Sequence, residues 1–206
     1  MDRRPNSAVA AIFLLLLLLS PCAAQDYTTA APDGTPSATS VQGCISSSFF
    51  GFSYRLPEGM VLDDMSSAPN GGIDPTHKNF ILFKAYRARS INRDVVDAAA
   101  EDRRSATGPS PESWMRTLHH WNSTRSDVRN QGDVESVTVG EQQFSRLRFH
   151  QLRDDGVITY ETAFAIGTRG YVVYFILGST DQVALALMEK SFETFSAEHA
   201  PCAVNK

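Results

Sequence analysis

The side chains whose types and spacing best suit chemistry are Arg146, Arg148, His150 and Glu161. They lie in two runs of alternating residues that meet at Asp155-Gly156, a strong signal for a hairpin with a two-residue loop. Such a loop places His150 opposite Glu161 on neighbouring strands, and the period of two places both arginines on the same sheet face as His150. An imidazole beside a carboxylate can transfer protons, but most such pairs are structural, with the carboxylate satisfying the imidazole. We therefore predict a polar cluster here and assign no catalytic residue to it.

No pattern of metal ligands and no activated nucleophile stands out elsewhere. His119-His120 is tempting, but neighbouring residues of a helix point about 100° apart, so the two imidazoles do not easily share one ion. Asp63-Asp64 and Asp154-Asp155 have the charge to attract Ca²⁺, but neither shows the alternating oxygen ligands of a calcium loop. The motifs GxSxG, SxxK, GxxxxGK(S/T), GxGxxG, HExxH and CxxC do not occur. The sequence thus predicts neither a metal nor a cofactor, and it favours a protein that is not an enzyme.

The first 24 residues have the layout of a secretory signal peptide. Two arginines precede an apolar run over residues 8–19, and small residues follow the run. The run of about 12 residues is shorter than the roughly 20 that a membrane-spanning helix needs. Cys22 is either a lipid attachment site or part of the removed peptide. Pro21 before it suits lipoprotein processing poorly, so we favour cleavage after Ala24. The sequence therefore predicts a secreted or periplasmic protein with no stable membrane anchor.

Two kinds of covalent modification are open to such an exported chain. Cys44 and Cys202 are the cysteines that remain after cleavage, and an even count outside the cytoplasm suggests a disulfide between them. That bond would join the start and the end of the fold; two unpaired thiols are the alternative. The triplet Asn122-Ser123-Thr124 is a glycosylation sequon, which is usable if the host is a eukaryote.

The exported chain divides into a leader and one domain. Residues 25–43 are rich in Thr, Ser, Ala, Pro and Gly and bury too little apolar area to offset ordering entropy, so we expect a flexible leader. Over 44–206, alternating and apolar runs predict a single α+β domain. Ser110-Pro111 predicts the start of a helix. Trp114 and Trp121 fall on one face of this helix, where core packing is favoured over a ligand platform.

The second half of the domain has the clearest pattern. Residues 171–177 are apolar without a break, which predicts a strand with both faces covered. Ser179 to Gln182 fits a capping box, so an amphipathic helix is expected after it. The alanines of the segment 95–102 favour a helix, whereas the strands expected on either side of it favour a strand. We predict a strand.

The order of these elements resembles the PsbP-like fold, named for an extrinsic subunit of photosystem II. The likeness covers roughly residues 49–196 and rests on an opening FFGFSYRLPEGM, a middle helix, a meander FSRLRFHQLRDDGVITYETAFAIGTRGYVVYFILG and a final helix TDQVALALMEKSFETF. The chain also resembles uncharacterised exported bacterial proteins with the same aromatic opening. The resemblance implies an α/β/α sandwich, in which an antiparallel β-sheet is flanked by helices on both faces. It also implies relatives that mostly bind proteins and are not enzymes.

Two functions agree with these observations. The first is an exported, non-catalytic protein-binding or assembly module whose contact surface includes Arg146, Arg148 and the loop 66–79. The second is a small-ligand carrier or an enzyme whose site lies between the sheet and the 111–122 helix. A deep, partly polar cavity at that place favours the second function, and a filled core favours the first. We expect the partner to be another protein. The formal net charge of −4, without a strongly basic patch, disfavours nucleic acid.

Overall fold

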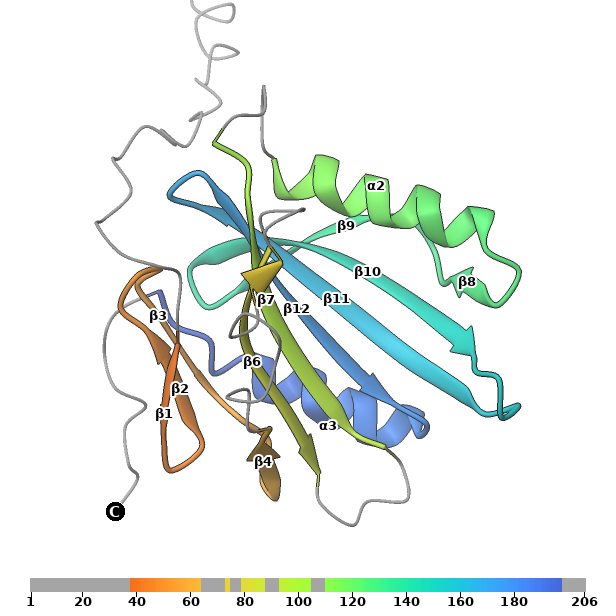
Figure 1. Cartoon of the computed structure of the whole chain (residues 1–206), viewed down its shortest axis with the longest axis horizontal. Coiled ribbons are helices and arrows are strands. Elements are labelled where there is room, and N and C mark those ends of the chain that lie inside the picture. Colours follow the sequence, from red (N-terminus) through yellow and green to blue (C-terminus); the bar gives the residue numbers. More distant parts are fainter. Residues whose placement is uncertain (1–37, 64–72, 75–78, 88–92, 105–109, 198–206) are drawn as a thin grey trace, which may run out of the picture.

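The computed structural model describes residues 38–63, 73–74, 79–87, 93–104 and 110–197. These residues form two antiparallel sheets and two helices (Figure 1). The strands are β1 Thr39–Val41, β2 Cys44–Ser47, β3 Phe52–Arg55, β4 Met60–Leu62, β5 Ile73–Asp74, β6 Asn79–Arg87, β7 Val95–Asp102, β8 Val128–Asn130, β9 Glu135–Val139, β10 Gln142–Leu152, β11 Ile158–Thr168 and β12 Tyr171–Ser179. The helices are α2 Pro111–Thr124 and α3 Gln182–Phe192. The predicted signal peptide lies outside the described residues. Neither helix of the described part combines the length and apolar character needed to cross a membrane.

The larger sheet has nine strands in a mainly sequential antiparallel arrangement. Seven of them follow the order β4-β6-β7-β12-β11-β10-β8, while β5 pairs with β6 and β9 pairs with β10. The segment 95–102 forms β7, so the preference for a strand there is confirmed. The apolar segment 171–177 lies in β12, between β7 and β11, so the predicted strand is confirmed; one face is fully buried, while Tyr174 and Ile176 on the other face are half-buried.

The hairpin between β10 and β11 differs from the prediction by one residue. Its loop holds three residues, 154–156, because Arg153 N donates to Val157 O and Gly156 N donates to Arg153 O, both at 2.9 Å. Gly156 has φ 77°, the left-handed conformation that is typical of the last residue of a three-residue hairpin loop. The extra loop residue pairs His150 with Tyr160 in place of Glu161. Because side chains alternate, this shift puts His150 and Glu161 on opposite faces of the sheet.

The smaller sheet, β1-β2-β3, begins inside the segment 25–43 that was expected to be a flexible leader. That expectation is wrong for β1, whose side chains are exposed but whose main chain pairs with β2. Gln42 and Gly43 have φ 49° and 75°, the conformation of a two-residue hairpin turn. Ser53 of β3 exchanges hydrogen bonds of 2.8 and 2.9 Å with Ser196, which ties the segment after α3 to this sheet. Backbone pairing therefore orders a strand whose side chains, Val41 included, are all exposed.

Both helices begin with a side-chain cap. α2 starts as predicted, because the Ser110 hydroxyl accepts a hydrogen bond of 2.9 Å from Ser113 N. α3 starts differently, since its cap is Asp181, whose carboxylate accepts from Val183 N at 2.8 Å. The predicted capping box at Ser179 is wrong, because the Ser179 hydroxyl is buried and donates to Asp94 Oδ1 at 2.7 Å.

The face of the larger sheet that α3 covers carries an aromatic core. α3 packs on β11, β12 and β3. Its Phe192 is 1% exposed and lies against the rings of Tyr54, Phe144, Phe164 and Phe175, with centroid distances of 4.4–5.5 Å. These rings come from β3, β10, β11 and β12, so a single side chain at the end of α3 joins both sheets.

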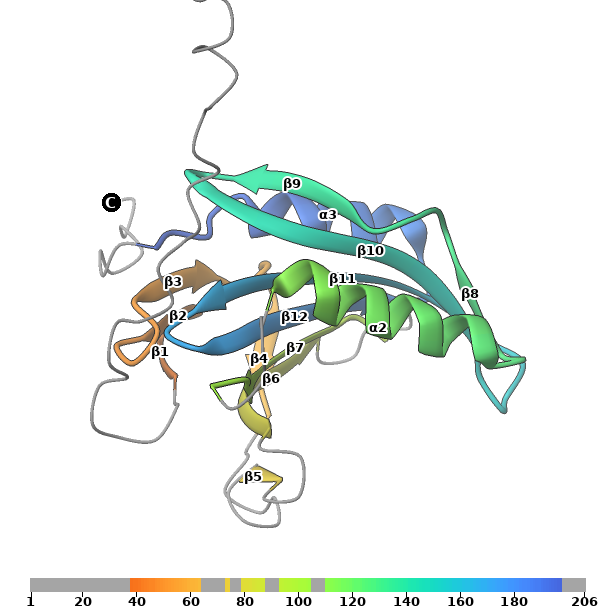
Figure 2. The same cartoon turned by 90° about the horizontal axis from the view of Figure 1, so that it is seen from above.

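The opposite face carries α2 over a smaller core (Figure 2). α2 packs on β8, β10 and β11, with Met115 against Leu147 and Ala163. Tyr174 and Ile176 of β12 lie on this face and are only half-buried. Each face of the sheet thus holds one helix that covers part of it, and the described residues do not form the two full helical layers of an α/β/α sandwich.

Candidate functional site

The predicted polar cluster divides between the two faces of the sheet. Arg146, Arg148 and His150 alternate along β10 on the face that α3 covers, whereas Glu161 of β11 lies on the α2 face. The Nδ1 atom of His150 lies 3.2 Å from Nε2 of Gln131. The prediction that His150 faces Glu161 is therefore wrong, and the two cannot form a proton-transfer pair through the sheet.

The arginines of this cluster pair with other carboxylates. Arg148 donates from Nε and Nη2 to the two oxygens of Glu189 of α3, at 3.0 and 2.7 Å. Thr162 donates to the same carboxylate at 2.5 Å. Arg146 pairs with Glu135 of β9. Burial acts to raise the pKa of Glu189, but the hydrogen bonds from Arg148 and Thr162 outweigh it, so the pKa lies below its ordinary value. The arrangement joins α3 to the sheet and is structural.

The variant Glu189→Gln is expected to lower the free energy of unfolding by about 1–3 kcal/mol at pH 7, because it removes charged hydrogen bonds at a half-buried site. A group whose folded pKa is depressed stabilises the fold above its unfolded pKa and loses this effect as the pH falls through the folded pKa. The difference from the parent protein should therefore shrink in acid. Urea unfolding at pH 7 and pH 3 measures this difference.

Glu112→Gln, in the exposed pair with Arg116, is the control and should lower the free energy of unfolding by at most about 0.5 kcal/mol. Equal losses in the two variants would contradict the prediction.

Glu161 has the most unusual carboxyl environment on the α2 face. It is half-buried beside Gly178 of β12, where a Cβ atom would lie 3.5 Å from Glu161 Cγ. Burial raises the pKa of Glu161 to about 7, the charge of Asp97 adds to the rise, and Arg153 and Arg125 oppose it. Burial also raises the pKa of Asp97. Two half-buried carboxyl groups thus lie on this face, and the nearby cations compensate their charge only in part.

The remaining predicted positions do not come together. His119 Nε2 lies 3.9 Å from Asp133 Oδ1, and His120 is exposed. Asp155 pairs with Arg93 at 2.7 Å. No three side chains of the types that bind metals gather within the described residues. Cys44 is the first residue of β2, while Cys202 lies outside the described residues, so their disulfide stays a prediction.

The sequon asparagine, Asn122, is buried between α2 and β8. It is 4% exposed, and its Nδ2 donates to Asn130 Oδ1 at 3.1 Å. Asn130 in turn donates to His119 O at 2.9 Å. The nitrogen that a glycan would need is therefore covered and hydrogen-bonded in the folded protein.

The chain secreted from a eukaryotic host is expected to carry no glycan on Asn122, and Asn122→Ala is expected to cost about 1–3 kcal/mol because it leaves Asn130 Oδ1 without its donor. Intact mass and urea unfolding test the two statements. Thr124→Ala removes the sequon but keeps the asparagine pair, so it should cost no more than about 0.5 kcal/mol. A glycosylated folded protein would contradict the expectation.

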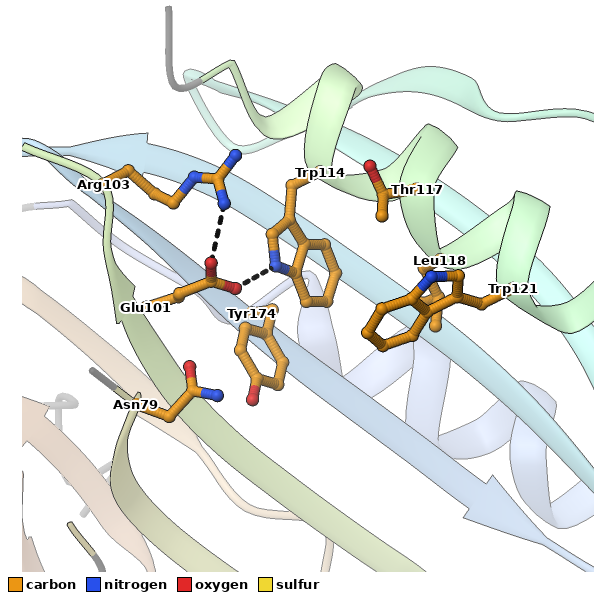
Figure 3. Close-up of a pocket in the computed structure, with 8 residues that line it drawn as sticks. All are labelled: Asn79, Glu101, Arg103, Trp114, Thr117, Leu118, Trp121 and Tyr174. Atoms are coloured by element: carbon orange, nitrogen blue, oxygen red, sulfur yellow. Dashed lines mark hydrogen bonds and ion pairs between the residues drawn. The ribbon is translucent and has the colours of Figure 1, made fainter. Parts of the chain in front are cut away.

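A cavity of about 440 Å³ lies between α2 and the sheet, at the place where the sequence put an alternative site. We call it the α2 pocket (Figure 3). It is lined by Asn79, Glu101, Arg103, Trp114, Thr117, Leu118, Trp121 and Tyr174. The helix supplies one wall, and β6, β7 and β12 supply the floor (Figure 3). A volume of this size is within the range of small-molecule sites.

Aromatic side chains form much of the α2 pocket. Trp114 stacks on Tyr174 with a centroid distance of 4.5 Å and an interplanar angle of 22°. Trp121 is 65% exposed at the rim. The prediction that both tryptophans pack in the core is wrong for Trp121; the last turn of α2 packs on β8 through the neighbouring Asn122 instead. Exposure of so large an aromatic face beside a cavity is typical of a binding surface.

The charged groups of the α2 pocket are paired with each other. Glu101 accepts from Arg103 Nη1 at 2.8 Å and from Trp114 Nε1 at 2.7 Å, one hydrogen bond at each carboxylate oxygen (Figure 3). Two further polar atoms of the lining, Asn79 Oδ1 and Arg103 Nε, are buried and have no hydrogen-bond partner among the described residues. Because these side chains come from β6 and from the end of β7, sequence reasoning did not find them; only the two tryptophans pointed to this place.

Comparison with known proteins finds no matching family model and no matching curated protein. Solved structures do match. Cyanobacterial PsbP (CyanoP) from Synechocystis sp. is 17% identical, with 82% of this chain and 96% of that chain covered and a TM-score of 0.50. LpqN of Mycobacterium tuberculosis, involved in cell envelope biogenesis, is 12% identical over 70% and 82% of the two chains, with a TM-score of 0.46. PA94 of Pseudomonas aeruginosa, a protein of unknown function, is 16% identical over 65% and 91%, with a TM-score of 0.41.

At these identities the similarity concerns the fold alone. The match to cyanobacterial PsbP covers most of both chains, and it agrees with the order of a β-hairpin, a middle helix, a β-meander and a terminal helix. The resemblance drawn from the sequence is confirmed: the chain has a PsbP-like fold.

Proposed function

We propose that this chain is an exported, non-catalytic binding protein and that the α2 pocket is its binding site. The observation that carries the proposal is the exposed Trp121 at the rim of a cavity whose wall is the Trp114–Tyr174 stack. A filled core at this place would have favoured a module that binds only through its outer surface. The cavity supports ligand binding instead.

The chemistry of the lining favours binding over catalysis. Glu101 is the carboxylate of the α2 pocket, and both of its oxygens accept hydrogen bonds from Arg103 and Trp114. A general acid or base needs a free position from which to exchange a proton with substrate. Because both of its oxygens are hydrogen-bonded, Glu101 holds the Trp114 ring in place and is poorly suited to proton transfer. Export is supported by the signal-like composition of residues 1–24.

Nuclear magnetic resonance with ¹⁵N-labelled protein tests the proposal. The chain has two tryptophans, so two indole N–H resonances report on the site. Neutral small molecules from a fragment library should shift the Trp121 indole resonance when they bind to the protein. Trp121→Ala should weaken their binding. Leu187→Ala, which changes an exposed residue of α3 on the other face, is the control and should bind as the parent does. Binding that moves neither indole, or that is unchanged in Trp121→Ala, would contradict the proposal.

A protein partner is a second candidate, favoured by an exposed apolar patch at the β4 edge of the larger sheet. Val61 and Tyr86 pair directly across β4 and β6 and are both exposed, and Leu62 is exposed on the other face of β4. β4 ends the run of strands on that side within the described residues, and edge strands are common docking places for other chains. Tyr86→Arg should abolish such an interaction and leave fragment binding at the α2 pocket unchanged; retained partner binding would exclude this edge.

A further inference from the structure

The charges in the α2 pocket cancel, which favours an uncharged ligand. The carboxylate of Glu101 lies 2.8 Å from the Arg103 guanidinium, and its second oxygen is occupied by Trp114 Nε1. A cation entering the pocket would compete with Arg103 for Glu101, and an anion would compete with Glu101 for Arg103. In both cases an existing charged hydrogen bond would be lost. A neutral molecule avoids this cost.

The aromatic groups require a ligand with a flat apolar face. The face of an indole carries negative charge density and attracts weakly positive C–H groups. Trp121 presents such a face at the rim, being 65% exposed. Trp114 and Tyr174 are stacked and form a rigid wall behind it. A molecule with C–H groups on one side can therefore lie against this surface without any further change in the pocket.

The uncharged polar groups around these rings suit hydroxyl groups. The Thr117 hydroxyl donates to Ser113 O at 3.0 Å and remains able to accept. Asn79 Oδ1 is an acceptor with no partner among the described residues. Burial raises the pKa of Tyr174 to about 12, with the charges of Glu101 and Asp97 adding to the rise, so its hydroxyl keeps its proton and can donate. The α2 pocket thus offers neutral donors and acceptors beside an aromatic face.

From this combination we propose that the α2 pocket binds a neutral pyranose sugar, with a C–H face of the ring on Trp121 and hydroxyl groups toward Thr117. The inference rests on the proposed function and specifies its ligand class. A sugar ring has an apolar face and a hydroxylated edge at the same time, whereas a purely aromatic molecule has only the apolar face. The volume of about 440 Å³ suits the end of a short glycan.

Titration of the ¹⁵N-labelled protein with glucose, N-acetylglucosamine and the β-1,4-linked trimer of each tests the inference. At least one trimer is expected to shift the Trp121 indole N–H resonance, with a dissociation constant on the order of 1 mM. Trp121→Ala should weaken this binding by about tenfold or more, because it removes the stacking face. Leu187→Ala is the matched control, because Leu187 is 64% exposed, like Trp121, but lies on α3. The dissociation constant of this variant for the trimer should stay within about twofold of that of the parent.

The outcomes separate the ligand class from the binding function. If no sugar shifts the indole resonance while a neutral aromatic probe such as benzyl alcohol does, the sugar inference is overturned and the pocket remains the binding site. If sugars bind equally well to Trp121→Ala, the inference is overturned as well. If neither the sugars nor the aromatic probe moves either indole resonance, both the inference and the proposed function are overturned.

Discussion

Phe192→Ala is expected to lower the free energy of unfolding by about 3–5 kcal/mol, the usual cost of removing a fully buried aromatic ring. The ring of Phe192 is 1% exposed and stacks on Phe164 at 4.4 Å, with Phe175 and Phe144 at 5.1 and 5.3 Å. Its removal leaves a cavity that elements from two sheets would have to close together. Urea unfolding measures the loss as a lower midpoint at constant slope.

Leu187→Ala in the same helix is the control for this experiment. Leu187 is exposed, so its truncation should change the free energy of unfolding by no more than about 0.5 kcal/mol. Phe192→Leu should fall between the two variants, since leucine fills part of the space. Equal effects of Phe192→Ala and Leu187→Ala would show that α3 does not pack on the sheet as described.

Glu161→Gln is expected to stabilise the protein at pH 8 by on the order of 3 kcal/mol and to have little effect at pH 4. The pKa of Glu161 is about 7 in the folded protein, against an ordinary value of 4.5. Below about pH 4.5 the carboxyl group is protonated in both states and makes no difference. Between about pH 4.5 and 7 it ionises in the unfolded chain first, so stability falls as the pH rises, and above pH 7 the loss is complete.

Urea unfolding of parent and Glu161→Gln between pH 4 and 8 measures this gain. The glutamine keeps the shape of the protonated acid and removes the charge beside Asp97. Glu193→Gln, at an exposed position after α3, is the matched control. Its free energy of unfolding should change with pH in the same way as that of the parent protein. A gain for Glu161→Gln that is the same at pH 4 and pH 8 would contradict the burial of this carboxyl group.

The regular elements of the fold were predictable because their patterns are local. The apolar run in β12 and the alternation in β10 and β11 each predict a strand without knowledge of the rest of the chain. The cap at Ser110 likewise marks the start of α2 within four residues. The resemblance to PsbP rests on the order of such elements, which explains why it survives at 17% identity.

The register of the hairpin between β10 and β11 was less predictable than the two strands themselves. Asp155-Gly156 fits a two-residue loop, and Asp154 to Gly156 fits a three-residue loop with the same left-handed glycine. The sequence contains no further signal that separates the two. Because one residue of shift exchanges the faces of a strand, this single choice moved Glu161 from the His150 side of the sheet to the α2 side.

The α2 pocket was only partly predictable for a different reason. Trp114 and Trp121 are visible as a pair on one helix, but helical spacing does not tell which of the two the rest of the protein covers. Tyr174 is distant in sequence from α2, Glu101 lies 13 residues before Trp114 on another element, and the pairing of β7 with β12 brings both onto the face where Trp114 lies. Such a site depends on tertiary contacts that no local pattern contains.

The most direct test of the binding function is a crystal structure of the protein purified from its own host without unfolding. The account predicts electron density for a bound molecule in the α2 pocket, in contact with the ring of Trp121. Density for a molecule bound elsewhere, with the Trp121 ring folded down to fill the pocket, would contradict it.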